Sequence, residues 1–285
     1  MVKWTAAKLP TMTGRTVVVT GASSGIGLIA AREFARAGAH VILAVRNAPK
    51  GRDVARTMNG DVQVRQLDVS DLASVREFAR AWTGPIDVLV NNAGVMDVPL
   101  TRTREGFDVQ TATNSFGPFL LTNLLLPHIT DRVVWVTSQL HRMGHLNLAD
   151  LSWDARSYKP MDAYNDSKLQ LVLFSLELQR RLDAAGSRVR SVLAHPGIAT
   201  TTLASHSSSN AINRFSLLLN DPEHGALPTM FAATQDVPGN AYVGPDGFGS
   251  VKGYPKVRKP GKTGLDEAAA RKLWGAVSTK VGVNA

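Results

Sequence analysis

Cysteine is absent from this chain of 285 residues, and its absence excludes several kinds of chemistry at once. Without thiols there is no disulfide framework, no thiolate metal site and no cysteine nucleophile. Long apolar runs are also missing: no window approaches the roughly 20 continuous apolar residues of a membrane-spanning helix. Residues 1–14 lack the apolar segment of a secretory signal. We therefore expect a cytoplasmic protein without a membrane span.

Acidic residues are outnumbered, with 23 Asp and Glu against 32 Lys and Arg, which gives a net charge of +9. Such a balance can indicate a nucleic acid, an anionic membrane or a phosphorylated ligand as partner. The basic residues are scattered, however, and the cluster at 252–262 lacks interleaved aromatic residues that could stack on bases. We expect a solvated basic surface and no nucleic-acid partner. We expect no metal site, because the i, i+4 pair His141 and His145 has no nearby glutamate.

Apolar residues make up 44% of the chain, and short β-branched runs alternate with stretches of helical periodicity. Strands are predicted at 16–20, 40–45, 62–67, 88–90, 133–136 and 189–193, and helices at 28–37, 48–58, 71–81 and 169–182. Continuous apolar runs bounded by turn residues are typical of strands buried on both faces. Their alternation with helices predicts a parallel sheet with right-handed crossovers. The fold class is therefore α/β, a single doubly wound Rossmann-type domain over residues 1–285, with a mainly parallel sheet flanked by helices.

A glycine-rich turn joins the first predicted strand to the first predicted helix. It comprises Gly21, Ser23, Ser24, Gly25, Ile26 and Gly27. Gly21 permits the tight turn, Gly25 leaves room for a pyrophosphate, and Gly27 lets the helix pack closely on the sheet. The free amides and the dipole of the helix N-terminus attract the anion. An ordinary strand-to-helix loop is the alternative for such a turn alone, but its place at the start of the fold favours a dinucleotide.

The end of the second predicted strand indicates which dinucleotide is bound. An acidic residue that binds a ribose 2′-hydroxyl is expected there, but the chain has Val45 followed by Arg46 and Asn47. A carboxylate would repel a 2′-phosphate, whereas an arginine can bind it through a planar, charge-assisted pair of hydrogen bonds. We therefore predict NADP(H), with NAD(H) as the alternative if Arg46 is an ordinary surface arginine. Ser24 is neutral where some NADP-selective proteins carry a second basic residue.

Tyr164 and Lys168 lie four residues apart at the start of a helical stretch, so both side chains project from one face. A tyrosine of reference pKa about 10 is a poor acid–base group at neutral pH. A lysine ammonium one turn away favours the phenolate and would bring the pKa toward a useful range. Ser138 follows the strand at 133–136, at the sheet edge where such folds bind ligands. A surface tyrosine–lysine pair is the alternative.

Together and in order, these motifs resemble the short-chain dehydrogenase/reductase family over residues 14–253. The resemblance implies that Asp68 and Val69 lie at the adenine ring. It also implies that Asn91 braces the sheet while the backbone of Ala93 and Gly94 passes beside the cofactor. It implies that Pro196, Gly197, Ile198 and Thr201 contact the nicotinamide carboxamide or the pyrophosphate. By the same resemblance Ser138 binds the substrate oxygen, and Asn114 holds a water that links Lys168 to solvent. Taken singly, Asp68 could be a turn aspartate and Asn114 a satisfied core amide.

One departure from the common pattern indicates a branch of the family. Ser138 and Tyr164 are 26 positions apart, rather than about a dozen as in most members, and His141 and Asp150 lie between them. With Arg46–Asn47 and Pro196–Gly197, this segment resembles the retinol-dehydrogenase-like branch, without the N-terminal anchor of many animal members. His141 is expected to be structural, the alternative being a donor to substrate.

We therefore predict an NADP(H)-dependent oxidoreductase that moves hydride between the nicotinamide and a lipophilic aldehyde, ketone or alcohol, with Tyr164 as general acid and base. Residues 203–228 are the predicted substrate lid and residues 254–285 a C-terminal extension. A catalytically silent NADP-binding sensor or scaffold is the alternative; an epimerase or dehydratase would favour another glycine spacing. Many members of the family pair through the helices that correspond to those near Tyr164 and Asn114. The leucines at 169, 171, 173, 176 and 178 could serve such an interface in a homo-oligomer or only the core, so the oligomeric state stays open.

Overall fold

The computed structural model describes residues 3–197 and 221–283. Its elements in chain order begin with the one-turn helix η1 (Ala6–Lys8), β1 (Thr16–Thr20), α1 (Gly25–Arg36), β2 (His40–Val45), α2 (Ala48–Ala55), β3 (Asp61–Gln66), α3 (Leu72–Arg80) and β4 (Ile86–Asn91). They continue with α4 (Val109–Thr111), η2 (Ala112–Phe116), α5 (Gly117–Leu125), η3 (Leu126–His128), β5 (Ile129–Val136), η4 (Gln139–Met143), α6 (Pro160–Ala184) and β6 (Arg190–Ala194). The last are α8 (Pro222–Thr234), β7 (Tyr242–Pro245), η7 (Phe248–Ser250), β8 (Pro255–Arg258), η8 (Lys262–Leu265) and α9 (Glu267–Val281).

The strands form one sheet in the order β3-β2-β1-β4-β5-β6-β7-β8. Neighbours from β3 to β7 pair in parallel, and β8 closes the β7 edge as an antiparallel strand. Strand order reverses between β1 and β4, because the chain runs outward to β3 and then returns to the other side of β1. In open sheets of this kind ligands bind at such a reversal, outside the carboxyl ends of the strands. The predicted doubly wound sheet is confirmed.

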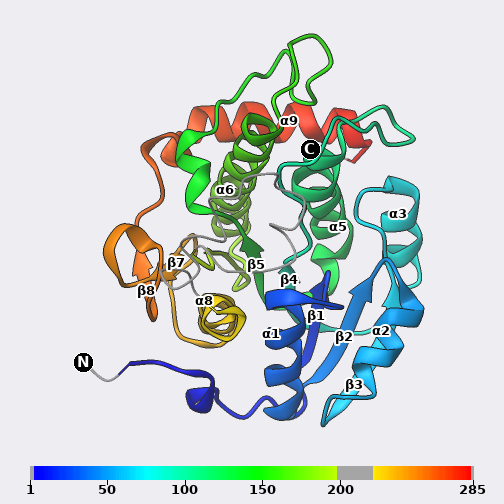
Figure 1. The fold of residues 1–285 in the computed structure, drawn as a ribbon, viewed down its shortest axis with the longest axis vertical. Helices are drawn as coiled ribbons and strands as arrows, with labels where there is room; N and C mark the ends of the chain where they lie inside the picture. The colour runs from blue at the N-terminus through cyan, green and yellow to red at the C-terminus, as the bar shows by residue number, and fades with distance from the viewer. Residues whose placement is uncertain (1–2, 198–220, 284–285) are drawn as a thin grey trace.

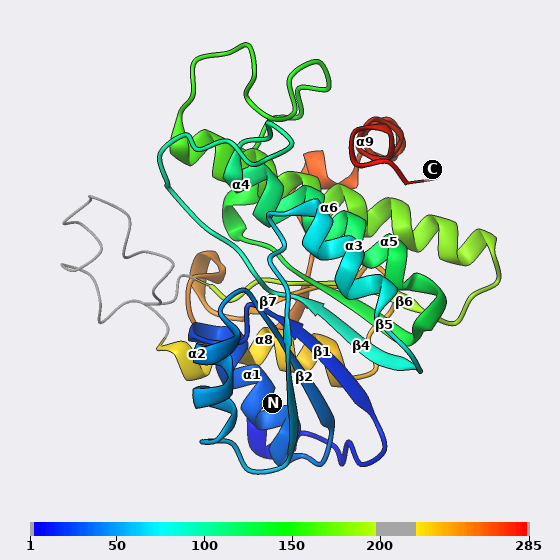
Figure 2. The same ribbon diagram turned by 90° about the vertical axis from the view of Figure 1, so that its right-hand side faces the viewer.

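Helices cover both faces of the sheet. Figure 2 shows α3, α5 and α6 on one face and α1, α2 and α8 on the other, with α9 beyond α6. The first layer packs around aromatic side chains: Phe119 lies 4.5 Å from Phe174 and 4.7 Å from Trp274 of α9, between ring centroids. Phe34 of α1 and Met230 of α8 are buried in the second. The inner strands are therefore apolar on both sides, which is why their sequence shows continuous runs, whereas the edge strand β3 alternates.

The region beyond residue 253 belongs to the packed fold. Strand β8 pairs with β7 from Tyr242 with Arg258 to Pro245 with Pro255, and Leu273 and Trp274 of α9 are buried against α6 and α5. Figure 1 shows α9 crossing the molecule over the ends of α5 and α6. Residues 203–220 of the predicted lid lie outside the described residues, and positions 222–228 form the first turns of α8.

Candidate active site

The turn after β1 lies directly against the turn after β4. Gly21 has φ +67°, and a Cβ there would lie 2.9 Å from Cα of Ala93. A Cβ on Gly27 would lie 2.3 Å from Nδ2 of Asn92. Any larger residue at either position would push the two turns apart. The glycine spacing is thus explained by close backbone approach at the point where strand order reverses.

The N-terminus of α1 is suited to an anion. Ser24 occupies the N-cap position but its side chain makes no capping hydrogen bond, and the first turn carries no acidic residue. The first backbone bond of the helix runs from the Leu28 amide to the Ser24 carbonyl at 3.3 Å. The preceding amides, at Gly25, Ile26 and Gly27, are the ones that α-helix geometry leaves without a partner inside the helix. These amides and the helix dipole supply the partial positive charge that a pyrophosphate needs.

Buried Thr20 connects the two turns, and sequence reasoning missed it. Its Oγ1 accepts hydrogen bonds from the amides of Asn92 and Ala93, each at 3.0 Å, while Asn92 Nδ2 donates to the Thr20 carbonyl at 2.8 Å. Asn91 at the end of β4 donates from Nδ2 to Thr122 Oγ1 on α5 at 2.8 Å. Asn91 therefore ties its strand to a helix, as expected of a bracing residue. A lone threonine at the end of a strand gives no sequence signal of this kind.

Residues predicted for the adenosine half lie at the ends of β2 and β3. Arg46 follows β2 and is exposed, and among the described residues no acidic side chain pairs with it. Asn47 caps α2 by accepting the Lys50 amide at 2.9 Å. Asp68 is half-buried and its Oδ1 accepts from the amide and the hydroxyl of Ser70, at 2.9 and 2.6 Å. Asp68 thus shapes its own turn, which is the alternative that its sequence position left open.

Val69 packs against α5, the helix that follows Asn114. A Cβ on Gly117 would fall only 1.8 Å from the Val69 carbonyl oxygen, so no side chain fits between α5 and the strand end. Gly117 was not predicted as a site residue. Its contact joins the adenine end of the predicted cofactor site to the turn that carries Asn114.

Asn114 lies in η2, a π-helical turn between α4 and α5. Its side chain is fully buried: Oδ1 accepts the Val95 amide at 2.8 Å, and Nδ2 donates to the Val95 carbonyl at 2.9 Å and to Ser167 Oγ at 3.0 Å. Single π turns often occur at functional sites, because they re-aim side chains within a helix. Asn114 therefore positions the segment after Gly94, and the water predicted for it stays a prediction.

Tyr164 and Lys168 both lie on α6, one turn apart, and both are buried with 4% of their surface exposed. Lys168 Nζ lies 5.7 Å from the centroid of the Tyr164 ring and donates to the Val136 carbonyl at 3.1 Å. Thr137 Oγ1 donates to the Lys168 carbonyl at 3.0 Å, which ties the end of β5 to α6. A Cβ on Gly94 would lie 3.2 Å from Asn114 Oδ1 and 3.4 Å from Lys168 Nζ. The fold thus brings Gly94, Asn114, Tyr164 and Lys168 together.

Burial dominates the acid–base properties of this pair. Desolvation raises the pKa of Tyr164 to about 12, and the Ser138 hydroxyl acts in the opposite direction. Desolvation lowers the pKa of Lys168 to about 8. The lysine ammonium was expected to lower the pKa of Tyr164, but removal from water has the larger effect and raises it. A Lys168 that titrates near neutrality is well suited to passing protons.

Ser138 is tied to the far end of the chain through His141. The serine is the N-cap of η4, and its Oγ accepts the Leu140 amide at 3.2 Å. The buried His141 ring lies 2.6 Å by Nδ1 from the Ser138 carbonyl and accepts the Gly261 amide at Nε2, at 2.8 Å. Both ring nitrogens are therefore bonded to the backbone, and burial lowers the pKa of His141 to about 4. The structural role expected for His141 agrees with these contacts.

The turn after β6 carries Pro196 and Gly197, both half-buried at the same edge of the sheet. Gly197 has φ +77° and its amide donates to Nδ1 of His195 at 3.2 Å. The His195 ring is fully buried and stacked on Tyr242, with its pKa lowered by desolvation to about 4. The predicted contacts of Ile198 and Thr201 lie outside the described residues.

The long segment between Ser138 and Tyr164 is anchored to α6 by residues that were not predicted. Asp166, buried two positions after Tyr164, accepts the His145 amide at 2.8 Å and pairs with Arg156 at 2.9 Å. Arg156 also pairs with Asp150 at 3.3 Å and lies 3.6 Å over the Trp153 ring. An aspartate inside a helical pattern is ordinarily assigned to the surface, so the sequence offered no signal for this role.

Two further searches concern residues 3–197 and 221–283 only. Within them, no group of three or more His, Asp or Glu side chains could hold a metal ion. No helix in the same ranges has both the length and the apolar character to cross a membrane.

Comparison with known proteins identifies the family. The model of the short chain dehydrogenase family matches residues 15–211, more than half of the chain. Human retinol dehydrogenase 13 is 38% identical over 96% of this chain and 87% of its own length. An uncharacterised protein from Mycobacterium paratuberculosis is 47% identical, with a TM-score of 0.89 over 99% of both chains.

A further solved structure was determined with NADP bound. It comes from Beutenbergia cavernae, is named as an NAD(P)-dependent gluconate 5-dehydrogenase, and is 26% identical. Its TM-score is 0.61 over 79% of this chain and 91% of that one. The match to retinol dehydrogenase 13 confirms the predicted resemblance to the retinol-dehydrogenase-like branch. The chain belongs to the short-chain dehydrogenase family.

Proposed function

We propose that the protein is an NADP(H)-dependent oxidoreductase that acts on a lipophilic aldehyde or ketone, or on the corresponding alcohol. The observation that carries the proposal is the buried pair Tyr164 and Lys168 beside Gly94 and the end of β5. Membership of the short-chain dehydrogenase family makes the protein an oxidoreductase. The cofactor, the acid–base role and the substrate class are the proposed parts.

The residues around the two turns fit a dinucleotide. Gly21 and Gly27 leave no space for side chains, and the N-terminus of α1 has no capping side chain or acidic residue to compete with an anion. Arg46 is exposed at the end of β2, and no carboxylate of residues 3–197 or 221–283 pairs with it, which favours a 2′-phosphate. The NADP bound to the Beutenbergia cavernae structure supports the same choice. When bound, NADP(H) would supply or accept the hydride.

In the reducing direction, the hydroxyl of Tyr164 donates its proton to the substrate oxygen as the carbonyl carbon receives hydride. The Ser138 hydroxyl binds the same oxygen and stabilises its developing negative charge. Lys168, with a pKa lowered to about 8, returns a proton toward the phenolate, and Asn114 holds the neighbouring Val95 segment in place. In the oxidising direction each proton moves the opposite way.

The lipophilic substrate class is supported by the relatives and by the segment that follows Ser138. Retinol dehydrogenase 13 is named for a lipophilic alcohol. In this chain Met143 is 62% exposed and Leu148 is 37% exposed, both in the stretch between Ser138 and Tyr164. Exposed apolar side chains in such a segment favour an apolar ligand. The cytoplasmic location and the homo-oligomer stay predictions.

The test is oxidation of NADPH by the purified protein with a panel of lipophilic aldehydes and ketones that includes retinaldehyde. We expect turnover by the wild type and none by Tyr164→Phe, with NADPH binding retained in both. The control Tyr254→Phe removes a hydroxyl far along the chain and should leave the rate unchanged. A wild type that binds NADPH but reduces nothing, or a Tyr164→Phe variant that stays active, would favour the silent sensor or scaffold instead.

A further inference from the structure

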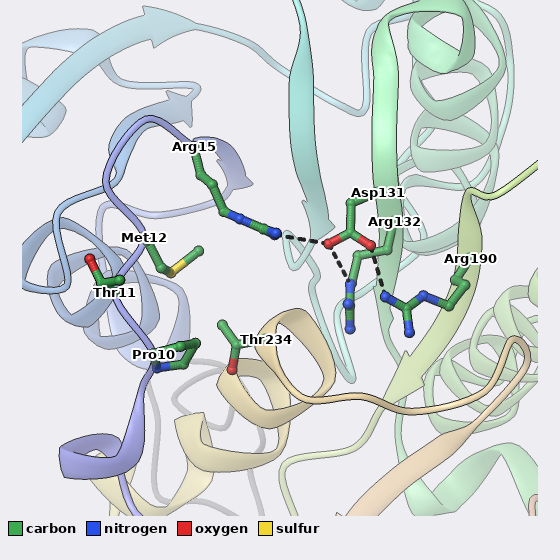
Figure 3. Close-up of a pocket in the computed structure, with 8 residues that line it drawn as sticks. All are labelled: Pro10, Thr11, Met12, Arg15, Asp131, Arg132, Arg190 and Thr234. Carbon is green, nitrogen blue, oxygen red and sulfur yellow. Dashed lines mark hydrogen bonds and ion pairs between the residues drawn. The ribbon is translucent and has the colours of Figure 1, made fainter.

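A cavity of about 290 Å³ opens at the amino ends of the strands, the edge of the sheet opposite Ser138 and Tyr164. Its charged lining comes from Arg15 before β1, Asp131 and Arg132 in β5, and Arg190 at the start of β6. Thr11 and Thr234 line it as well. Figure 3 shows the three arginine side chains converging on the one carboxylate.

Positive charge exceeds negative charge in this lining. Asp131 Oδ2 lies 3.0 Å from Arg15 Nη1 and 3.2 Å from Arg132 Nε, and Oδ1 lies 3.0 Å from Arg190 Nη2. Three guanidiniums and one carboxylate leave a net charge of +2. Burial alone would raise the pKa of Asp131, but Arg132, Arg190 and Arg15 together lower it, so the carboxylate is charged. Asp236 also pairs with Arg190, but it is fully exposed and does not line the cavity.

Arg132 is a buried and rigidly held cation. Its side chain is 4% exposed, and its Nη1 donates to the carbonyls of Ala232 at 2.9 Å and Gln235 at 2.8 Å. Since Nε donates to Asp131, the position of the guanidinium is fixed by three hydrogen bonds. Within the part of the chain that the structure describes, Nη2 has no acceptor. A cation held in this way binds an anion with little loss of side-chain entropy.

The other two arginines have donors to offer as well. Arg15 bonds Asp131 through Nη1 only, and its side chain is 45% exposed. Arg190 donates through Nη1 to Asp236 and Val237 and through Nη2 to Asp131. Its Nε has no acceptor in the described ranges. Each of the three guanidiniums therefore bonds Asp131 and keeps at least one N–H group that has no acceptor in the described ranges. A cluster of ion pairs that only joined the amino ends of the strands would not require positive charge and N–H donors beyond those that Asp131 neutralises.

We propose that this cavity is a second anion site, which binds a phosphate group. A phosphate dianion matches the net charge of +2, and its several oxygens can accept from donors that arrive from different directions. The volume is at the lower end of ligand pockets, about 300 Å³, so the bound group is small. The site is separate from the predicted pyrophosphate site, because the two lie at opposite edges of the sheet.

Inorganic phosphate, titrated calorimetrically into the protein at constant ionic strength, tests the site. We expect saturable binding, weakened at least about tenfold by Arg15→Gln and by Arg190→Gln, since each removes charged donors to the phosphate. Arg56→Gln is the matched control, because Arg56 is exposed and pairs with Asp53, and its affinity should equal that of the wild type. Because Arg15 and Arg190 lie at the amino ends of the strands and Arg46 lies at a carboxyl end, a loss in these two variants separates this site from any cofactor phosphate site.

A phosphate on a small molecule and a phosphate on a lipid are distinguished by a second measurement. Vesicles of phosphatidylcholine with or without phosphatidic acid are sedimented with the wild type and with Arg190→Gln. Binding of inorganic phosphate alone indicates a small soluble ligand, whereas binding that needs phosphatidic acid and Arg190 indicates a headgroup. The proposal is overturned if neither probe binds, or if Arg15→Gln and Arg190→Gln fold normally by circular dichroism and bind phosphate as the wild type does.

Discussion

The side chain of Asn114 binds both backbone polar groups of Val95, accepting from its amide at 2.8 Å and donating to its carbonyl at 2.9 Å. One side chain therefore holds in place the segment after β4, at Gly94 and Val95, which passes close to Lys168. Asn114→Ala should lower the free energy of unfolding by about 1–3 kcal/mol, because it leaves these groups without partners. Urea denaturation measures this loss, and the rate of NADPH oxidation should fall with it. Asn123→Ala, which removes one bond to Phe119 within α5, is the control; equal losses in both variants would contradict the special role of Asn114.

Lys168 is destabilising where it lies, because its pKa of about 8 is below the ordinary 10.5. The unfolded chain binds more protons than the folded one between these values, so stability rises with pH across that window and the full cost is present below pH 8. Lys168→Met should therefore abolish turnover yet raise the free energy of unfolding at neutral pH by about 1–3 kcal/mol. The gain should shrink as the pH approaches about 10.

Denaturation of both proteins across that pH range measures the Lys168 effect. Lys272→Met, which removes an exposed lysine of α9, should leave stability unchanged at every pH. A Lys168→Met variant that is less stable than the wild type at all pH values would contradict the desolvation argument.

Arg46 should set the preference between the two nicotinamide cofactors. Arg46→Ala is expected to weaken NADPH binding at least about tenfold, because a charge-assisted contact to the 2′-phosphate is lost, while NADH binding changes little. Fluorescence titration with each cofactor measures both. Arg52→Ala, an exposed arginine of α2, should alter neither, and equal losses of NADPH and NADH in Arg46→Ala would rule out the 2′-phosphate contact.

The two buried histidines should make the protein sensitive to acid. Burial lowers the pKa of His141 and of His195 from 6.5 to about 4, so each is neutral in the folded state. Between these values the unfolded chain takes up protons that the folded chain does not. As the pH is lowered through this window, the free energy of unfolding should therefore decrease by about 1.4 kcal/mol per pH unit for each histidine.

Denaturation at several pH values measures that slope. His141→Gln should reduce the slope by the contribution of one histidine, about 1.4 kcal/mol per pH unit. His128→Gln, which replaces a half-buried ring hydrogen-bonded to Gly84, should not reduce it. A slope that is unaffected by His141→Gln would show that other groups control acid unfolding.

The strands were predictable from the sequence because burial on both faces leaves continuous apolar runs. The strand at 40–45 was predicted with its full bounds, and the helix predicted at 71–81 is α3, with Asp71 as its N-cap. Helix α1 begins at Gly25, three residues before the predicted start, because glycines that serve the turn hide the helical pattern. The predicted helix at 169–182 begins instead at Pro160, so Tyr164 and Lys168 lie inside it.

The features that the sequence did not reveal depend on contacts between distant residues. The π turn at Asn114 is buried throughout, and the side chain of Asn114 bonds Val95, 19 positions earlier. Thr20 and Asp166 act through backbone amides of Asn92, Ala93 and His145, which carry no side-chain signature. The arginine-lined cavity joins residues from four separate segments of the chain. Sequence motifs predicted the candidate catalytic and cofactor-binding residues, whereas the residues that hold them in place could be recognised only in the three-dimensional structure.

The hydrogen bonds between the Gly261 amide and His141, and between His141 and the Ser138 carbonyl, also affect folding during translation. The serine, tyrosine and lysine are all translated well before residue 261, and Trp274 then packs on the helix layer that carries them. The catalytic residues therefore gain their last supports only near the end of translation. A messenger truncated shortly after the motifs would encode every residue of the chemistry and still yield an unfinished enzyme.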